Sequence, residues 1–254
     1  MKIKLLICMM MSSLLLCGCS LIEKETEEET LEPVMIEDVK VISDIKYNKN
    51  NNFEPIIYLK EKDEYRPYIV ATDDYDGKTL LVRKELLSEE MRISEYIAYY
   101  GDSEIDSYLN GEFIDNLPEE TKNIIVDSEI EIRSKDSVGE DNYDTEYINR
   151  KVFLLSATEL GCKEAGVMAS EGKPLKYFQA YENCYATPED SEQKASWWTR
   201  SAYFTNVSCV CAVSPKGQVG YTNAFDDNGI RPAFCVEGNL SVKLVDDKFV
   251  LDLE

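Results

Sequence analysis

The chain contains no histidine, and this absence excludes much of enzyme chemistry. Without an imidazole there is no Ser-His-Asp or Cys-His nucleophilic catalysis, and nearly all catalytic zinc and non-haem iron sites are excluded as well. Carboxylate pairs, thiolates, lysine, tyrosine and oxygen-ligated cations remain. We therefore expect no cofactor and no metal site, and we assign no catalytic residue.

Basic residues are also scarce, since 27 Lys and Arg stand against 49 Asp and Glu and give a formal net charge of -22. Such a surface has no basic stripe that could displace counterions from phosphates, so we expect no nucleic-acid partner. It also repels anionic lipid headgroups. We attribute the charge to solubility outside the cell, in preference to a specific cationic partner.

The first residues have the pattern of a bacterial lipoprotein signal peptide. Lys2 and Lys4 precede an apolar run that ends at Leu16, which is shorter than the roughly 20 residues of a transmembrane helix. Gly18 and Cys19 then complete the lipoprotein cleavage pattern. We predict a signal peptide over residues 1–18, acyl chains on Cys19 as the contact with the membrane, and a location on the extracytoplasmic face of the bacterial cell membrane. The alternatives are an ordinary signal peptide cut elsewhere and a short membrane anchor.

The remainder divides into an acidic tether and one domain. Residues 19–54 are crowded with glutamate, which keeps such a segment extended, and residues 55–254 suffice for a single domain. We predict two helices, one beginning at Asp102 or Ser103 and one after Pro118, and a surface loop over 133–149. The strands and hairpins are expected at residues 68–71 with 79–82, 151–156, 207–214, 218–221, 230–234 and 242–245 with 249–253. The fold class is α+β, with two helices packed on a small, mostly antiparallel sheet with long loops.

Four short segments carry a resemblance to a known family. They are Tyr108 to Phe113 (YLNGEF), Phe153 to Ser156 (FLLS), Trp197 to Ser201 (WWTRS) and Gly229 to Ala233 (GIRPA). Together they resemble a family of bacterial extracytoplasmic domains of unknown function whose members carry YLNGEF, FLLS, WWLRS and GVRPA in this order, over roughly residues 56–238. That family is in turn distantly similar to C-type-lectin-like folds, including the formylglycine-generating (sulfatase-modifying) domains. The resemblance implies a C-type-lectin-like domain.

Within these segments we distinguish candidate ligand-binding residues from structural ones. An exposed indole stacks well on a sugar ring, so Trp197, Trp198 and Arg200 are the ligand-binding candidates. The alternative is that one Trp fills the core while the other covers its rim, and that the arginines bind internal carbonyls or carboxylates such as Glu159. Four further residues are assigned structural roles: Phe113, Phe153, Arg231 and Pro232.

Five cysteines follow Cys19, and an odd number outside the cytoplasm leaves a free thiol or an intermolecular bridge. They are Cys162, Cys184, Cys209, Cys211 and Cys235. If the strand at 207–214 is regular, Cys209 and Cys211 share a face. They are then buried small side chains, partners of Cys235 on a neighbouring strand, or the thiolates of an enzyme.

Acidic pairs at Glu89–Glu90 and Glu119–Glu120 could serve as an acid and base for glycoside cleavage. Neighbours in sequence diverge on a helix, so we interpret both pairs as solvated helix faces.

The leading functional hypothesis is a surface-displayed, lipid-anchored and non-catalytic module. It binds a glycan or a protein partner through loops of the lectin-like domain, chiefly 133–149, 157–194 and 222–229. One alternative is a thiol-dependent oxidase that is related to the formylglycine-generating enzymes and uses Cys209 and Cys211. Another is a structural envelope protein joined to a second chain through the odd cysteine.

Overall fold

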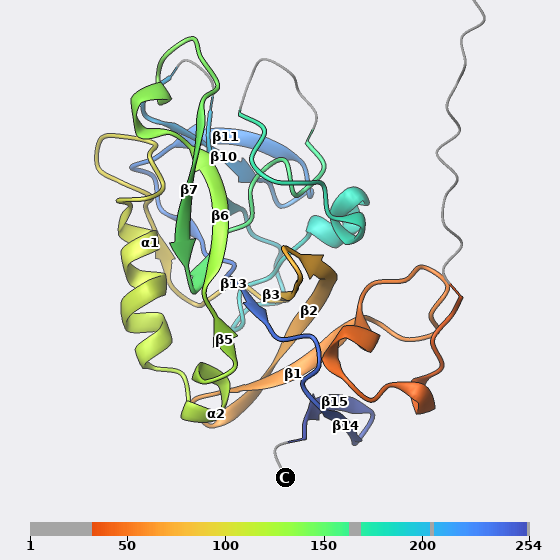
Figure 1. Ribbon diagram of the computed structural model, residues 1–254. Coiled ribbons are helices and arrows are strands. Elements are labelled where there is room, and N and C mark those ends of the chain that lie inside the picture. The colour runs from red at the N-terminus through yellow and green to blue at the C-terminus, as the bar shows by residue number, and fades with distance from the viewer. Residues whose placement is uncertain (1–31, 163–168, 204–205, 253–254) are drawn as a thin grey trace, which may run out of the picture. The chain divides into compact units, whose positions relative to one another are not determined.

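The computed structural model describes residues 32–162, 169–203 and 206–252 (Figure 1). Strands account for 36% of the protein and helix for 16%, so the fold is mostly β. The expectation of a C-type-lectin-like domain with two helices on one small sheet is wrong. Several sheets are present, and among the described residues only the continuous helical segment 104–115 reaches seven residues. The segment after Pro118 forms a single turn, and the chain beyond it pairs as a strand instead of continuing the helix.

The larger sheet has eight strands and curls into part of a barrel. Its strand order is β14 (Val242–Val245), β15 (Lys248–Leu251), β1 (Ile56–Glu61), β2 (Glu64–Tyr75), β3 (Lys78–Arg83), β13 (Ala233–Val236) and β5 (Ile125–Val126), and β8 (Val152–Phe153) also pairs with β13. β1 and β15 run parallel, and the other pairs are antiparallel. β3 and β13 are buried along nearly their whole length, so the core lies around them.

Two hairpins of this sheet were correctly predicted from their turns. Asp76 and Gly77, with φ of 53° and 75°, connect β2 to β3, and Asp246 and Asp247, with φ of 48° and 60°, connect β14 to β15. Two central residues with positive φ match the right-handed twist of the flanking strands. The expected strand over 230–234 begins after Pro232, which has no N–H to donate to a neighbour.

A second sheet and a separate hairpin complete the β structure. The five-stranded sheet has the order β11 (Val219–Asn223), β10 (Cys209–Val213), β9 (Trp197–Ala202), β12 (Asn228–Gly229) and β4 (Glu90–Met91). The hairpin joins β6 (Ser128–Arg133) to β7 (Thr145–Arg150). β7 falls within the predicted loop 133–149, so that prediction was too long. The alternation of buried and exposed residues in β6 was a readable strand signal.

The helical part is short. Ser103 Oγ accepts a hydrogen bond from Asp106 N and begins α1 (Glu104–Tyr108), as predicted. The helix continues as one turn of π-helix, η3 (Leu109–Phe113), and α2 (Glu119–Lys122) follows (Figure 1). The remaining helical pieces are 3-10 turns: η1 (Ile36–Asp38), η2 (Ile42–Ile45), η4 (Lys135–Ser137), η5 (Lys176–Gln179) and η6 (Tyr181–Cys184).

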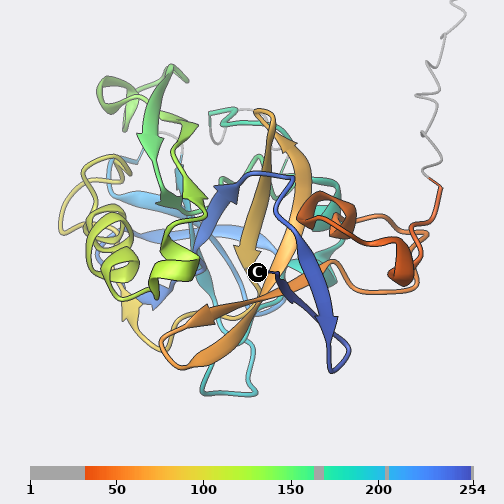
Figure 2. The same cartoon turned by 60° about the horizontal axis from the view of Figure 1, so that its bottom comes forward.

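The described part of the predicted tether belongs to the folded body, and the compact unit begins at Glu32. Ile42 and Ile45 are fully buried, and Ile42 N donates to Leu240 O. Figure 2 shows the first described residues, in orange-red, beside the blue C-terminal strands. The body therefore starts well before the expected boundary at residue 55. Cys19 lies outside the described residues. None of the helices within the described ranges combines the length and apolar character needed to cross a bilayer.

Candidate functional site

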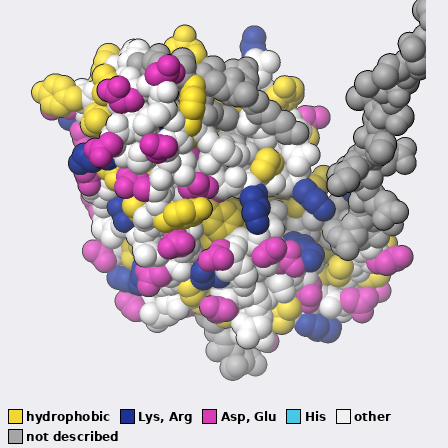
Figure 3. Space-filling view, turned by 45° about the horizontal axis from the view of Figure 1, so that its top comes forward, with side chains coloured by type: hydrophobic (Ala, Val, Ile, Leu, Met, Phe, Trp, Pro, Cys, Tyr) yellow, Lys and Arg dark blue, Asp and Glu magenta, His cyan; other side chains and the backbone are white. Residues whose placement is uncertain are grey.

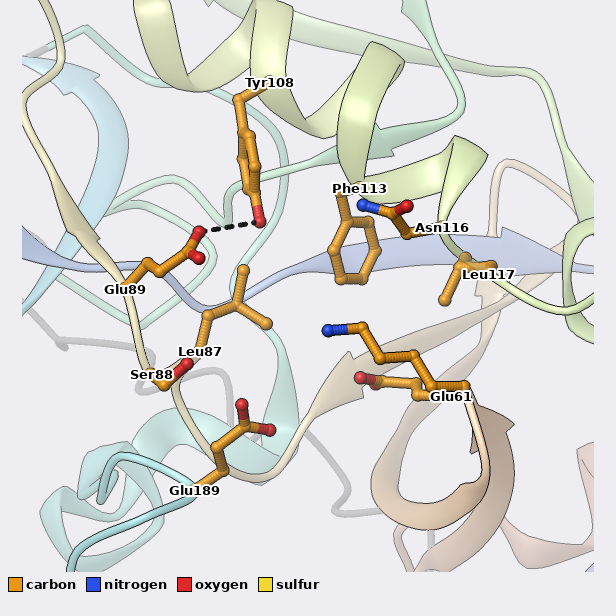
Figure 4. Close-up of a pocket in the computed structure, with 10 residues that line it drawn as sticks. Glu61, Leu87, Ser88, Glu89, Tyr108, Phe113, Asn116, Leu117 and Glu189 are labelled. Carbon is orange, nitrogen blue, oxygen red and sulfur yellow. Dashed lines mark hydrogen bonds between the residues drawn. The ribbon is translucent and has the colours of Figure 1, made fainter.

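A cavity of about 70 Å³ lies between the helical segment and the loop that leaves β3 (Figure 4). Its apolar lining comes from Leu87, Phe113 and Leu117. Its polar lining comes from four segments of the chain: Glu61 and Lys62, Ser88 and Glu89, Tyr108 and Asn116, and Glu189. We call this cavity the carboxylate pocket.

The helical wall of the carboxylate pocket depends on the π turn. Tyr108 and Phe113 are five residues apart, and the wider turn with i to i+5 hydrogen bonds brings residues at this separation to one side. Tyr108 is half-buried, and its hydroxyl donates to Glu89 Oε2 over 3.4 Å. Burial, with the negative charge of Glu89, raises the pKa of Tyr108 to about 12, so the phenol stays a hydrogen-bond donor at neutral pH.

Two of the three glutamates are paired with one buried arginine. Arg83 is fully buried, its Nε lies 2.8 Å from Glu61 Oε1, and its Nη2 also binds Glu189. Burial alone would raise the pKa of Glu189, but Arg83 holds it below its ordinary value. The ion pairs of Glu61 and Glu189 with Arg83 stabilise the wall of the pocket, so these two carboxylates already have a partner within the protein.

Glu89 differs from the other two glutamates. Its hydrogen bond with Tyr108 is long for an O–H···O contact, which is usually close to 2.8 Å. Within the described part of the chain it forms no ion pair. Lys62 is exposed at the other side of the pocket, at the turn between β1 and β2. An open carboxylate, a phenol and an ammonium group thus surround an apolar floor.

The loop opposite the helix, residues 84–89, is fixed by the GIRPA segment. Leu87 N donates to Ile230 O over 3.0 Å, and Arg231 Nε donates to Arg83 O over 2.9 Å. Gly229 pairs with Glu90 at the end of the loop. A Cβ on Gly229 would lie 2.6 Å from Leu86 Cδ1 and 2.7 Å from Ser196 O, so only glycine permits this approach.

The WWTRS segment also positions the loop. Trp198 Nε1 donates to Met91 O over 2.7 Å and so fixes β4, which directly follows Glu89. Trp197 Nε1 donates to Cys184 O over 3.1 Å. Both indoles are fully buried, because β9 is covered on both faces. The expectation that one ring faces outward is not met, and neither ring presents a surface on which a ligand could stack.

Arg200 is buried in a polar cluster at the other end of β9. Its Nη1 and Nη2 lie 2.7 and 2.9 Å from the two carboxylate oxygens of Glu159, which is also fully buried. Tyr75 donates to Glu159 as well. The structural alternative, an internal carboxylate partner, is the arrangement observed, and Arg200 has no exposed surface through which to bind a ligand.

Glu171 is a second buried acid beside this pair. It accepts hydrogen bonds from Arg133 N at 2.6 Å and from Ser201 Oγ. Burial raises the pKa of Glu171 to about 7, against the opposing effect of Arg200. We call Glu159, Glu171 and Arg200 the interior acid cluster.

The residues expected to be structural lie in the core. Phe113, Phe153, Arg231 and Pro232 are all buried. The guanidinium of Arg231 lies 5.0 Å from the Trp197 ring and 5.4 Å from the Phe178 ring. Its Nη1 is buried without a hydrogen-bond partner among the described residues, and burial lowers the pKa of Arg231 to about 10. Arg231 holds the loop through backbone carbonyls instead of a carboxylate.

The cysteines form no disulfide in the described part of the chain. Cys209 and Cys211 lie on β10, whereas Cys235 lies on β13 in the other sheet, so the predicted neighbouring strands are not neighbours. Burial raises the pKa of Cys209, and it raises the pKa of Cys235 to about 12. A raised pKa works against thiolate chemistry. No group of residues in the described ranges could hold a metal ion.

Sequence reasoning missed the carboxylate pocket. It placed Glu89 and Glu90 on a solvated helix, but Glu89 lies in the loop and Glu90 pairs in β4. Tyr108 was noted as part of the predicted helix and of the family resemblance, and Phe113 as part of the same resemblance and as a structural residue. Glu61 and Glu189 carried no local signal, since their link through Arg83 is a contact between distant segments.

Comparison with known proteins gives one result. A family model described as "Domain of unknown function (DUF6273)" matches residues 76–238. The match includes the helical wall and the loop of the carboxylate pocket, and leaves out Glu61 and Lys62. No curated protein and no solved structure matches the chain.

Proposed function

The chain belongs to the domain-of-unknown-function family DUF6273, and from the geometry of the carboxylate pocket we propose that it is a non-catalytic glycan-binding module. The module is anchored by acyl chains on Cys19 at the extracytoplasmic face of a bacterial membrane. Its pocket holds a hydroxyl-bearing end of a saccharide. The observation that carries the proposal is the open Glu89 carboxylate, which lines the same pocket as Tyr108, Lys62 and the apolar side chains.

The polar groups of the pocket suit hydroxyl groups. A sugar hydroxyl donates to a carboxylate and accepts from a phenol or an ammonium group, so it can satisfy Glu89, Tyr108 and Lys62 together. A cationic ligand would be repelled by Lys62, and an anionic ligand would be repelled by Glu89. The apolar part of the lining, from Leu87, Phe113 and Leu117, suits the C–H groups at the edge of a sugar.

The volume of the pocket limits what enters. At about 70 Å³ it equals roughly two to three water volumes of about 30 Å³ each. Sites that enclose a whole small ligand measure about 300–1,000 Å³. The pocket therefore takes only a few atoms, such as one edge or one hydroxymethyl arm of a sugar in a larger glycan.

The sequence supports the anchor and the family features of this proposal. Residues 1–19 have the lipoprotein pattern. Two residues of the YLNGEF segment, Tyr108 and Phe113, line the pocket. The proposal that the pocket is non-catalytic is supported by Arg83, which forms ion pairs with Glu61 and Glu189. Among the residues that line the pocket, Glu89 therefore has no second unpaired carboxylate with which to form an acid and base pair.

Amide NMR spectra of the full-length chain in non-ionic detergent test the proposal. The probes are the methyl glycosides of glucose, galactose, mannose and N-acetylglucosamine, with ethanediol as the control for hydroxyl groups alone. We expect at least one glycoside to shift the amide signals of Lys62, Ser88, Glu89 and Asn116, and ethanediol to leave them in place. Shifts that centre elsewhere, or no shift with any glycoside, would overturn the proposal.

A further inference from the structure

A group of exposed aromatic side chains lies on β11, an edge strand of the five-stranded sheet, and on the segments beside it. Tyr96, Tyr221 and Phe225 are 74%, 58% and 52% exposed, and Val207 is 47% exposed. Tyr203 stacks on Tyr221 with ring centroids 3.9 Å apart and an interplanar angle of 18°. We call these five residues the aromatic patch.

Backbone hydrogen bonds join the segments that carry the aromatic patch. Ser94 N donates to Ala224 O over 3.0 Å, which brings the Tyr96 segment to the Phe225 segment. Ala98 N donates to Val207 O over 2.7 Å, so the same segment also adjoins Val207. The patch therefore combines three parts of the chain that are far apart in sequence.

The turn that presents Phe225 is already ordered. Asp226 Oδ2 accepts from Thr222 Oγ1 at 2.7 Å and from Asn223 N at 3.3 Å, and Asp226 N donates to Asn223 O. The hydrogen bond from Thr222 lowers the pKa of Asp226, so this carboxylate is ionised at neutral pH. A turn closed in this way loses little conformational entropy when a ligand binds.

Charge restricts the occupant of the aromatic patch. Glu95 and Asp227 are exposed next to Tyr96 and Phe225, and Arg92, which interacts electrostatically with both acids, is paired with Glu104 at 2.7 Å. On the face of the molecule shown in Figure 3, acidic side chains are more frequent than basic ones. Anionic polymers and anionic membranes are repelled from such a surface.

We propose that the aromatic patch binds a neutral polysaccharide chain, with the exposed rings stacked on the apolar faces of its sugars. Aromatic rings supply four of the five side chains, and Asn206, Ser208 and Thr222 beside them carry amide and hydroxyl groups. Exposed apolar side chains gathered in this way mark a binding surface. The acidic residues around them disfavour an anionic ligand, and the amide and hydroxyl groups beside the rings can pair with the hydroxyl groups of sugars.

This surface is separate from the carboxylate pocket. None of the five patch residues lines the pocket, and none of the residues that line the pocket belongs to the patch. The inference goes beyond the proposed function, since it stands if the pocket binds nothing.

Affinity electrophoresis of the full-length chain in non-ionic detergent tests this inference. The native gels contain hydroxyethylcellulose, laminarin or galactomannan as neutral probes, and polygalacturonate as the anionic one. We expect at least one neutral polysaccharide to retard the protein, with no change on adding salt, because stacking is not screened as charge pairs are. Tyr221→Ala and Phe225→Ala should weaken the retardation about tenfold, as the loss of about 1.4 kcal/mol would.

Matched variants separate the patch from general effects. Tyr147 is 63% exposed on β7, so Tyr147→Ala removes an equally exposed ring elsewhere and should change nothing. Tyr221→Phe keeps the ring and should keep binding. Glu89→Ala removes only the pocket carboxylate. If this variant is still retarded, the polysaccharide binds without the pocket, and a failure of the pocket is distinguished from a failure of the patch. The inference would be overturned if no neutral probe retarded the protein, or if it bound only polygalacturonate or lipid vesicles. It would also be overturned if Tyr147→Ala lost as much retardation as the patch variants.

Discussion

The interior acid cluster and the carboxylate pocket use the same residue type in opposite ways. In the cluster, both oxygens of Glu159 are bound by Arg200, and Glu171 accepts from Arg133 N and Ser201 Oγ. In the pocket, Glu89 has a single contact of 3.4 Å with Tyr108. A buried charge must be paired to be tolerated, so a saturated carboxylate indicates a structural role. An open carboxylate beside an apolar floor indicates a binding role.

The largest expected effect lies in the interior acid cluster. Glu159→Gln removes the charge that compensates the fully buried Arg200, and breaking a buried pair costs about 3–5 kcal/mol. Urea denaturation should show this loss in the free energy of unfolding, while Glu129→Gln on the exposed side of β6 should show none. A loss below about 1 kcal/mol would show that the ion pair between Glu159 and Arg200 does not have the structural role assigned to it.

The second effect is a pH dependence of Glu171. Its pKa is raised from 4.5 to about 7 in the folded protein, so the folded state holds this proton more tightly than the unfolded chain does. Its contribution to stability is fully present below about pH 4.5 and is lost as the pH rises through about 7, a change of about 3 kcal/mol.

Glu171→Gln removes this titration. The free energy of unfolding of the wild type relative to this variant should therefore fall by about 3 kcal/mol between pH 4 and pH 8. If the free energy of unfolding changed with pH in the same way for both proteins, the carboxyl group of Glu171 would be more accessible to water than the structure shows.

The third effect tests whether the pocket loop is rigidly supported. Gly229→Ala places a Cβ 2.7 Å from the backbone oxygen of Ser196, and such overpacking costs about 1–3 kcal/mol. Gly220→Ala is the control, because its Cβ would meet no atom within 4 Å. Thermal unfolding should separate the two variants. If they unfold alike, the loop beside β12 moves freely and the scaffold does not determine the position of Glu89.

The smallest effect on stability is expected in the pocket. Glu89→Ala removes one long hydrogen bond and no ion pair, so the free energy of unfolding should change by less than about 0.5 kcal/mol. Urea denaturation beside Glu159→Gln makes the contrast direct. A loss of more than about 2 kcal/mol would place Glu89 with the structural acids and remove the distinction.

Local signals made part of the fold predictable. Ser103 began the helix, and the turns at Asp76–Gly77 and Asp246–Asp247 formed the hairpins, because each depends on neighbouring residues. The fold class was wrong because the pattern after Pro118 supports only one helical turn and the following residues join a sheet. The apolar residues Ile42 and Ile45 were overlooked within an acidic stretch.

The site was harder to predict because long-range contacts decide it. The burial of both Trp197 and Trp198 follows from the central position of β9, which the alternation of its residues does not reveal. The difference between Glu89 and Glu189 lies in Arg83, a residue on another segment. Composition could exclude histidine chemistry, but it could not identify which of 49 acidic residues is left open.

The most direct test of the account is the affinity of two alanine variants for the methyl glycoside that gives the largest NMR shifts. Glu89→Ala and Glu129→Ala each remove one negative charge, the first in the pocket and the second on the exposed side of β6. We predict that Glu89→Ala weakens binding roughly tenfold or more, as expected for the loss of a hydrogen bond to a charged group, and that Glu129→Ala binds like the wild type. Equal affinities for both variants would contradict the assignment of Glu89 as the ligand-binding carboxylate.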